Sequence, residues 1–185
     1  DAPLADRLRP RQLTDIVGQD HLVGSEGTIG RMIAAGRLSS IVLWGPPGTG
    51  KTSLARLLAD QTELHFKAIS AVFSGVADLK KVFAEAEMRF QSGKATLLFV
   101  DEIHRFNRSQ QDSFLPYVER GTVVLVGATT ENPSFELNAA LLSRAQVLIL
   151  NRLDTVALGK LLEKAEILED KSLPLTVNAR EALIA

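Results

Sequence analysis

Short apolar runs alternate with longer stretches of helical periodicity through the middle of the chain. In the run at residues 95–100 the apolar character is nearly unbroken, as in a strand that is covered on both faces. Between the runs, apolar residues recur every three or four positions, which indicates amphipathic helices. Strands joined by helical crossovers are parallel, so the pattern predicts an α/β sandwich. The predicted strands are residues 41–44, 65–70, 95–100, 122–130 and 146–151.

Helices are predicted between these strands. The first follows a Gly/Pro loop and places Leu54, Leu57 and Leu58 on one face. Another contains Pro116 within its pattern, which predicts a kink or an early end because proline lacks the amide hydrogen that a helix interior needs. Apart from the first, the predicted helices are residues 76–93, 109–121 and 138–145.

The two ends of the chain differ from this regular middle. Periodicity is weak before the first strand, and Pro10 predicts an extended arm that leads into a short helix. After the last strand the pattern becomes helical, with a break near Pro174. We therefore predict an α/β domain over residues 1–150. Residues 151–185 are expected to be the truncated start of an all-α lid domain.

The composition narrows the class of protein. Of the 185 residues, 45% are apolar and 23% are charged, which is typical of a globular protein with a sizeable core. No run of 18 apolar residues occurs, so no membrane partner and a cytoplasmic location are expected. The absence of cysteine excludes disulfides and thiolate metal sites. The net charge of −1 gives no support for a nucleic-acid partner, although local arginine clusters leave a basic patch open.

The loop after the first strand, "GPPGTGKT", fits the pattern G-x-x-x-x-G-K-[ST] in full. Its glycines let backbone amides turn onto phosphate oxygens, and the following helix directs its positive end at the same anion. A lysine and a threonine then supply a charge for the β- and γ-phosphates and a hydroxyl for Mg²⁺. This motif predicts a P-loop three-layer αβα sandwich. The expected nucleotide contacts are Gly45, Pro46, Pro47, Gly48, Thr49, Gly50, Lys51, Thr52 and Ser53.

Two adjacent carboxylates, Asp101 and Glu102, follow the apolar run "LLFV". Open α/β sheets bind ligands at the carboxyl ends of their strands, where these acids would meet the phosphate loop. Asp101 is expected to hold Mg²⁺ beside Thr52. Glu102 is expected to polarise a water molecule for attack on the γ-phosphorus. The alternative is two solvated carboxylates at a strand end.

Three long stretches resemble one family closely. They are "PLADRLRPRQLTDIVGQDHLVG", "DEIHRFNRSQQDSFLP" and "GATTENPSFELNAALLSR". Together they resemble the clamp-loader-like branch of the AAA+ ATPases. More narrowly, they are similar to the family of replication-associated recombination protein A and the Werner helicase-interacting protein. The resemblance covers nearly all of residues 3–150 and implies an AAA+ core.

The resemblance also implies roles for single residues. Thr130 matches the polar sensor that contacts the γ-phosphate or the attacking water. Arg144 matches the arginine finger, which reaches the ATP of a neighbouring subunit. Ser70 matches a polar position that restrains the catalytic glutamate, where clamp-loader relatives usually carry asparagine. Each of these residues also has a plain structural alternative, as a strand-end residue or a surface ion pair.

The arm before the phosphate loop resembles the segment that wraps the adenine, with a purely structural arm as the alternative. No match to the family's second sensor arginine occurs in 151–185, so this residue is expected outside the chain. The adenine-contacting residues implied by the resemblance are Leu8, Arg9, Pro10, Val17, Gly18 and Gln19.

The resemblance implies ATP and Mg²⁺ as cofactors and a DNA-stimulated ATPase that maintains DNA at stalled or damaged replication forks. Its implied partners are forked DNA, strand junctions or ends, further copies in a homotetramer, and single-strand-binding protein. One alternative is an ATP-gated scaffold with little turnover, against which Glu102 and Arg144 argue. Another is a P-loop kinase for a small metabolite, which the arm and the finger-like arginine disfavour.

Overall fold

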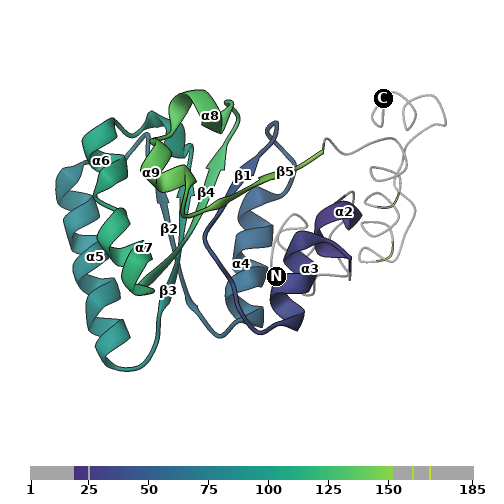
Figure 1. The fold of residues 1–185 in the computed structure, drawn as a ribbon, viewed down its shortest axis with the longest axis horizontal. Helices are drawn as coiled ribbons and strands as arrows, with labels where there is room; N and C mark the ends of the chain where they lie inside the picture. Colours follow the sequence, from purple (N-terminus) through teal and green to yellow (C-terminus); the bar gives the residue numbers. More distant parts are fainter. Residues whose placement is uncertain (1–18, 25, 152–159, 161–166, 168–185) are drawn as a thin grey trace.

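The sheet at the centre of the molecule has five parallel strands in the order β2-β3-β4-β1-β5 (Figure 1). The computed structural model describes residues 19–24, 26–151, 160 and 167. Every strand after the first is reached by a crossover, which confirms the expected α/β fold with a parallel sheet. The strands are β1 (Ile41–Trp44), β2 (His65–Ser70), β3 (Thr96–Asp101), β4 (Val123–Thr129) and β5 (Gln146–Ile149).

Helices cover both faces of the sheet, which makes three layers (Figure 1). One face carries α2 (Asp20–Val23), α3 (Thr28–Ala34) and α4 (Lys51–Gln61). The other face carries α5 (Val76–Gln91), a 3₁₀ turn η2 (Ile103–Arg105), α6 (Arg108–Asp112), α7 (Leu115–Arg120), α8 (Pro133–Glu136) and α9 (Ala139–Leu142).

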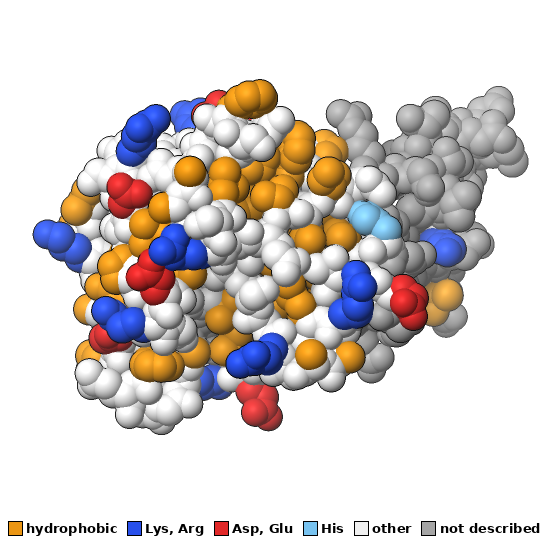
Figure 2. Space-filling view, in the orientation of Figure 1, with side chains coloured by type: hydrophobic (Ala, Val, Ile, Leu, Met, Phe, Trp, Pro, Cys, Tyr) orange, Lys and Arg blue, Asp and Glu red, His pale blue; other side chains and the backbone are white. Residues whose placement is uncertain are grey.

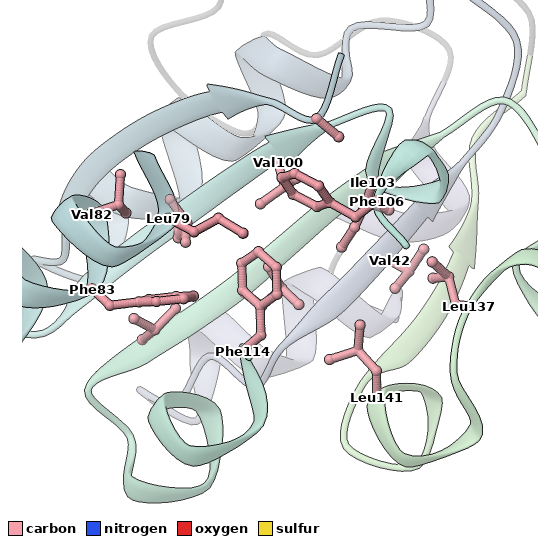
Figure 3. Close-up of a cluster of buried hydrophobic side chains, with 14 of the residues drawn as sticks. Val42, Leu79, Val82, Phe83, Val100, Ile103, Phe106, Phe114, Leu137 and Leu141 are labelled. Atoms are coloured by element: carbon pink, nitrogen blue, oxygen red, sulfur yellow. The ribbon is translucent and has the colours of Figure 1, made fainter. Parts of the chain in front are cut away.

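Side chains from alternate strand positions fill a separate core on each face. In β3, Leu97 and Phe99 pack toward α4, whereas Leu98 and Val100 pack toward α5. The second core is shown in Figure 3, where Phe83 and Phe114 meet edge to face with ring centroids 5.2 Å apart. A buried side chain of this size contributes about 1.5–3 kcal/mol by removal from water. These two cores fix the sheet and therefore the edge from which the functional loops leave.

The predicted helix over residues 109–121 is divided in two. The first helix ends at Asp112 and the second begins at Leu115, with Pro116 in its first turn. Proline is tolerated there because the first amides of a helix have no partner within the helix. The prediction of an early end is confirmed, although the break lies before the proline. The short helix α8 had no counterpart in the sequence prediction.

Most of the segments that flank the sheet lie outside the described residues. The predicted arm before Gln19 and the predicted helical domain after Asn151 lie outside the described residues, apart from Lys160 and Ile167. None of the described helices has the length and apolar character that a membrane crossing requires. On the left of the view in Figure 2, over α5, α6 and α7, basic and acidic side chains are interspersed. This agrees with the balanced net charge.

Candidate active site

The carboxyl ends of β1, β3 and β4 meet at one edge of the sheet. In the strand register, Trp44 lies opposite Thr129, and the amide of Gly45 donates to the carbonyl of Thr129 at 3.1 Å. A cavity of about 320 Å³ opens at this edge. It is lined by Pro47, Gly48, Thr49, Gly50, Lys51, Thr52, Ser53, Asp101, Glu102, Thr129 and Thr130. The structure therefore brings the phosphate-loop motif and the acidic pair into one pocket.

The loop between β1 and α4 forms one wall of this cavity. Gly50 precedes the helix with φ of 85°, a left-handed conformation that residues with a side chain adopt only at a cost. The Thr49 hydroxyl donates to the Pro46 carbonyl at 3.0 Å and holds the loop closed on itself. The helix that follows is 11 residues long, and its first amides lack partners within the helix. This arrangement suits an anion such as a phosphate.

The Lys51 ammonium lies against the loop that precedes it. Its Nζ atom donates to the carbonyls of Gly45 at 2.7 Å and of Pro46 at 2.9 Å. Burial lowers the pKa of Lys51 from its ordinary value of 10.5, while the charges of Asp101 and Glu102 oppose that shift. The protein therefore compensates the positive charge of the Lys51 ammonium only in part. This favours a further anionic partner in the cavity.

The two carboxylates that line the cavity leave the chain with different backbone geometries. Asp101 is the last residue of β3 and is exposed in the cavity. Glu102 has φ of 51° and ψ of 47°, a left-handed conformation that is uncommon for a residue other than glycine. Such a conformation costs on the order of 1–3 kcal/mol and persists only where the surroundings impose it. Because the backbone turns between them, the two acids need not serve the same ligand.

Thr129 ends β4 and Thr130 follows it, and the two residues differ in their surroundings. Thr130 is exposed and lines the cavity. Thr129 is 1% exposed, and its hydroxyl lies 2.8 Å from Nδ1 of His104. His104 is not among the site residues predicted from the sequence. Its position two residues after the acidic pair is the only signal that could have drawn attention to it.

Two other candidate residues lie apart from the cavity lining. Ser70 is level with Asp101 in the sheet, and its hydroxyl accepts from the Val72 amide at 3.3 Å. Gln19 is fully buried, and its side-chain amide exchanges two hydrogen bonds with the backbone of Asn151, at 2.8 and 3.1 Å. Through these bonds Gln19 connects the residue before α2 to the chain just after β5. An adenine contact by its side chain would compete with these bonds.

Arg144 follows α9 on the surface of the molecule. Its guanidinium contacts Glu119 at 2.5 Å, and it donates to the Ala140 carbonyl at 2.9 Å and to the Ser143 hydroxyl at 3.1 Å. The side chain is 39% exposed and does not belong to the cavity of its own chain. The remaining adenine candidates, Leu8, Arg9, Pro10, Val17 and Gly18, lie outside the described residues.

The oxygen atoms in the cavity suit a hard divalent cation. Thr52 and Asp101 line the same cavity and offer a hydroxyl and a carboxylate, and both residues are exposed. Within the described ranges, no group of three or more His, Cys, Asp or Glu residues could hold a metal alone. Mg²⁺ is commonly held by one or two protein oxygens together with substrate phosphates and water. The donor set therefore fits Mg²⁺ that arrives with a nucleotide.

Comparisons with known proteins agree with this geometry. The family model for "ATPase family associated with various cellular activities (AAA)" matches residues 41–153. Replication-associated recombination protein A of Escherichia coli strain K12 is 51% identical over 170 residues, which cover 92% of this chain and 38% of that protein. The ATPase WRNIP1 of Dictyostelium discoideum is 44% identical over 186 residues, covering 98% of this chain and 21% of that protein.

A solved structure of the Thermotoga maritima RuvB Holliday junction branch migration motor is also similar. It shares 28% identity with a TM-score of 0.70, over 88% of this chain and 55% of that one. The chain spans less than half of the length of the curated relatives named above. Since the family model covers more than half of the chain and includes the phosphate loop and the acidic pair, the chain belongs to the AAA family of ATPases.

Proposed function

We propose that this chain is the nucleotide-hydrolysing core of a DNA-maintenance ATPase that acts at stalled or damaged replication forks. The observation that carries the proposal is the single cavity lined by both the phosphate loop and the pair Asp101 and Glu102. The biological setting rests on the identity of 51% with a protein named for replication-associated recombination. The chain covers only 38% of that relative, so DNA binding by the whole protein is part of the proposal.

The residues of the cavity divide the work of hydrolysis between them. Lys51 and the loop amides hold the triphosphate, and Thr52 with Asp101 hold Mg²⁺, which neutralises phosphate charge when bound. Glu102 accepts a hydrogen bond from the attacking water and orients it toward the γ-phosphorus. Thr130 contacts that water or the γ-phosphate from the neighbouring strand end.

Two substitutions test these roles. Lys51→Ala should abolish ATP binding, because it removes the cation that the cavity directs at the phosphates. Glu102→Gln should retain ATP binding and lower the rate of hydrolysis by about 10²–10⁴-fold, the usual worth of a general base. Glu63→Gln is a matched control, since Glu63 is an exposed glutamate that also has a positive φ, of 58°, and is not part of the cavity. Normal hydrolysis by the Glu102→Gln protein would refute the proposed role in water activation.

Arg144 is proposed to complete the active site of a neighbouring subunit. Its exposure and its place outside its own cavity support action in trans. A guanidinium there would neutralise charge that builds on the transferring phosphoryl group. Arg144→Ala subunits and Lys51→Ala subunits should each be inactive, whereas mixed oligomers should regain part of the activity. Mixed oligomers without any activity would contradict the proposal.

The proposed partners are forked DNA, strand junctions or ends, a homotetramer of the full-length protein, and single-strand-binding protein. Phosphate release by the full-length protein should be measured with forked, nicked and single-stranded DNA, and Lys51→Ala should be the blank. Stimulation by forked or junction DNA supports the proposal. Binding of these DNAs with no change in a very slow turnover would instead indicate an ATP-gated scaffold.

A further inference from the structure

We infer that His104 is a positioning residue, which holds the turn bearing Glu102 against the end of β4 and so keeps Glu102 in place relative to Thr130. The inference deepens the proposed function, because it rests on Glu102 as the residue that orients the attacking water. It concerns a histidine that does not line the cavity and therefore acts through other residues.

The Glu102 conformation needs support from its surroundings. Its left-handed backbone is unfavourable for a residue with a side chain. Immediately after it, η2 closes one tight turn, in which the Arg105 amide donates to the Glu102 carbonyl at 2.9 Å. The Phe106 amide also donates to the Ile103 carbonyl at 3.2 Å, and two bonds of this kind are weak support for a strained residue. The turn must therefore be fixed from outside, and the outside element is β4.

Two contacts with the same face of β4 provide that support. Ile103 is fully buried over Gly127, where an added Cβ atom would lie 3.0 Å from Ile103 Cδ1 and 3.1 Å from its Cγ2. Figure 3 shows Ile103 among the buried side chains of this face. His104 then reaches Thr129, which is two residues further along β4 and so points to the same face. Because residue 127 is glycine, the Ile103 turn can approach β4 closely. The bond from His104 to Thr129 then fixes the position of this turn along β4.

The Thr129 hydroxyl joins the turn to the loop that follows β4. It accepts from the Glu131 amide at 3.0 Å and lies 3.2 Å from the Glu131 carbonyl. A hydroxyl has one hydrogen to donate and two lone pairs, so it can serve His104 and the Glu131 backbone together. Thr130 lies between these two anchors and lines the cavity. His104 therefore links the residue that orients water with the residue that contacts the γ-phosphate.

This geometry predicts a specific kinetic defect. Without the bond, the Glu102 turn can move relative to Thr130 while the phosphate loop keeps its shape. A displacement of about 1 Å in a catalytic group can cost on the order of 10²-fold in rate. We expect His104→Leu to lower kcat by roughly 10–100-fold, with little change in KM for ATP. His104→Asn, whose short amide retains a polar atom, should lose less activity than His104→Leu.

A double-mutant cycle with Thr129→Val separates this role from general damage. Thr129→Val keeps the shape of the side chain and removes the hydroxyl. If the bond carries the effect, the double variant should be no slower than the slower single variant. Losses that multiply would show that the two residues act independently and would overturn the inference.

His21→Leu is the control for loss of a histidine. His21 bonds a backbone carbonyl of β5 at 2.8 Å, away from the cavity, so this variant should keep its kcat.

The cycle is read on the full-length protein alongside Glu102→Gln. If Glu102→Gln retains turnover, the proposed role of Glu102 fails whatever the cycle shows. If Glu102→Gln is inactive and His104→Leu has normal kcat, only the positioning role of His104 fails. If His104→Leu does not fold, the same cycle is measured with His104→Asn and Thr129→Val.

The ATP affinity of each variant, followed by Trp44 fluorescence, should match that of the unmodified protein. A loss of affinity equal to the loss of kcat would also overturn the inference.

Discussion

Replacement of Gln111 by methionine should lower the free energy of unfolding by about 3 kcal/mol, the sum of three hydrogen bonds worth roughly 1 kcal/mol each. Gln111 is 2% exposed. Its Nε2 donates to the carbonyls of Phe106 at 2.9 Å and Glu136 at 3.1 Å, and its Oε1 accepts from the Asn138 amide at 2.8 Å. Methionine preserves the length and volume of the side chain but leaves these three backbone groups without their partner.

Urea denaturation followed by fluorescence is a suitable assay, because Trp44 is the one tryptophan in the sequence and lies where β1 meets the phosphate loop. For a chain of this size the melting temperature should fall by roughly 6–12 °C. Gln91→Met at the exposed end of α5 is the control and should change stability by less than about 0.5 kcal/mol. A loss below about 1 kcal/mol for Gln111→Met would refute the reasoning, since it would mean that water or relaxation replaces the bonds.

Three further predictions concern charge and local bonding. Burial lowers the pKa of Lys51 below the 10.5 of the unfolded chain, so the unfolded state binds more protons as that pH is approached. The free energy of unfolding should therefore rise with pH in this range relative to Lys51→Met, and urea titrations at several pH values measure the slope. Glu119→Gln breaks the Arg144 pair but should cost less than about 1 kcal/mol in the same assay, because both side chains are well exposed. Ser40→Ala removes the buried hydroxyl that accepts from the Leu125 amide at 2.9 Å, and should destabilise the fold by about 1–3 kcal/mol in urea.

Much of the fold could be predicted because its signals are local. The strand predicted at 65–70 is the observed β2, and the run predicted at 95–100 is shifted by one residue from Thr96–Asp101. The apolar run identifies β3 because burial on both faces requires it, whereas β2 lies at the edge of the sheet and is only half-buried. The order β2-β3-β4-β1-β5 depends on contacts between distant segments, and the pattern along the chain does not specify it.

The same distinction applies to the site. The phosphate loop and the acidic pair were predicted to meet because both follow strands of one parallel sheet, and they line one cavity. The left-handed backbone of Glu102 and the bond from His104 to Thr129 could not be predicted, because both depend on how η2 packs on β4. Gln19 was expected near the adenine, but its buried bonds to Asn151 depend on a contact across the length of the chain.

The placement of β1 beside β4 has a consequence for biosynthesis. The phosphate loop leaves the ribosome before Thr129, which lies opposite Trp44 in the sheet. Contacts between such distant segments form only after the intervening chain has been made. Until then, the lysine and glycines of the phosphate loop are present in the growing chain, but the pocket that they form with the other strand ends is not complete. Nucleotide can begin to favour the native state only when β4 has been translated and has taken its place.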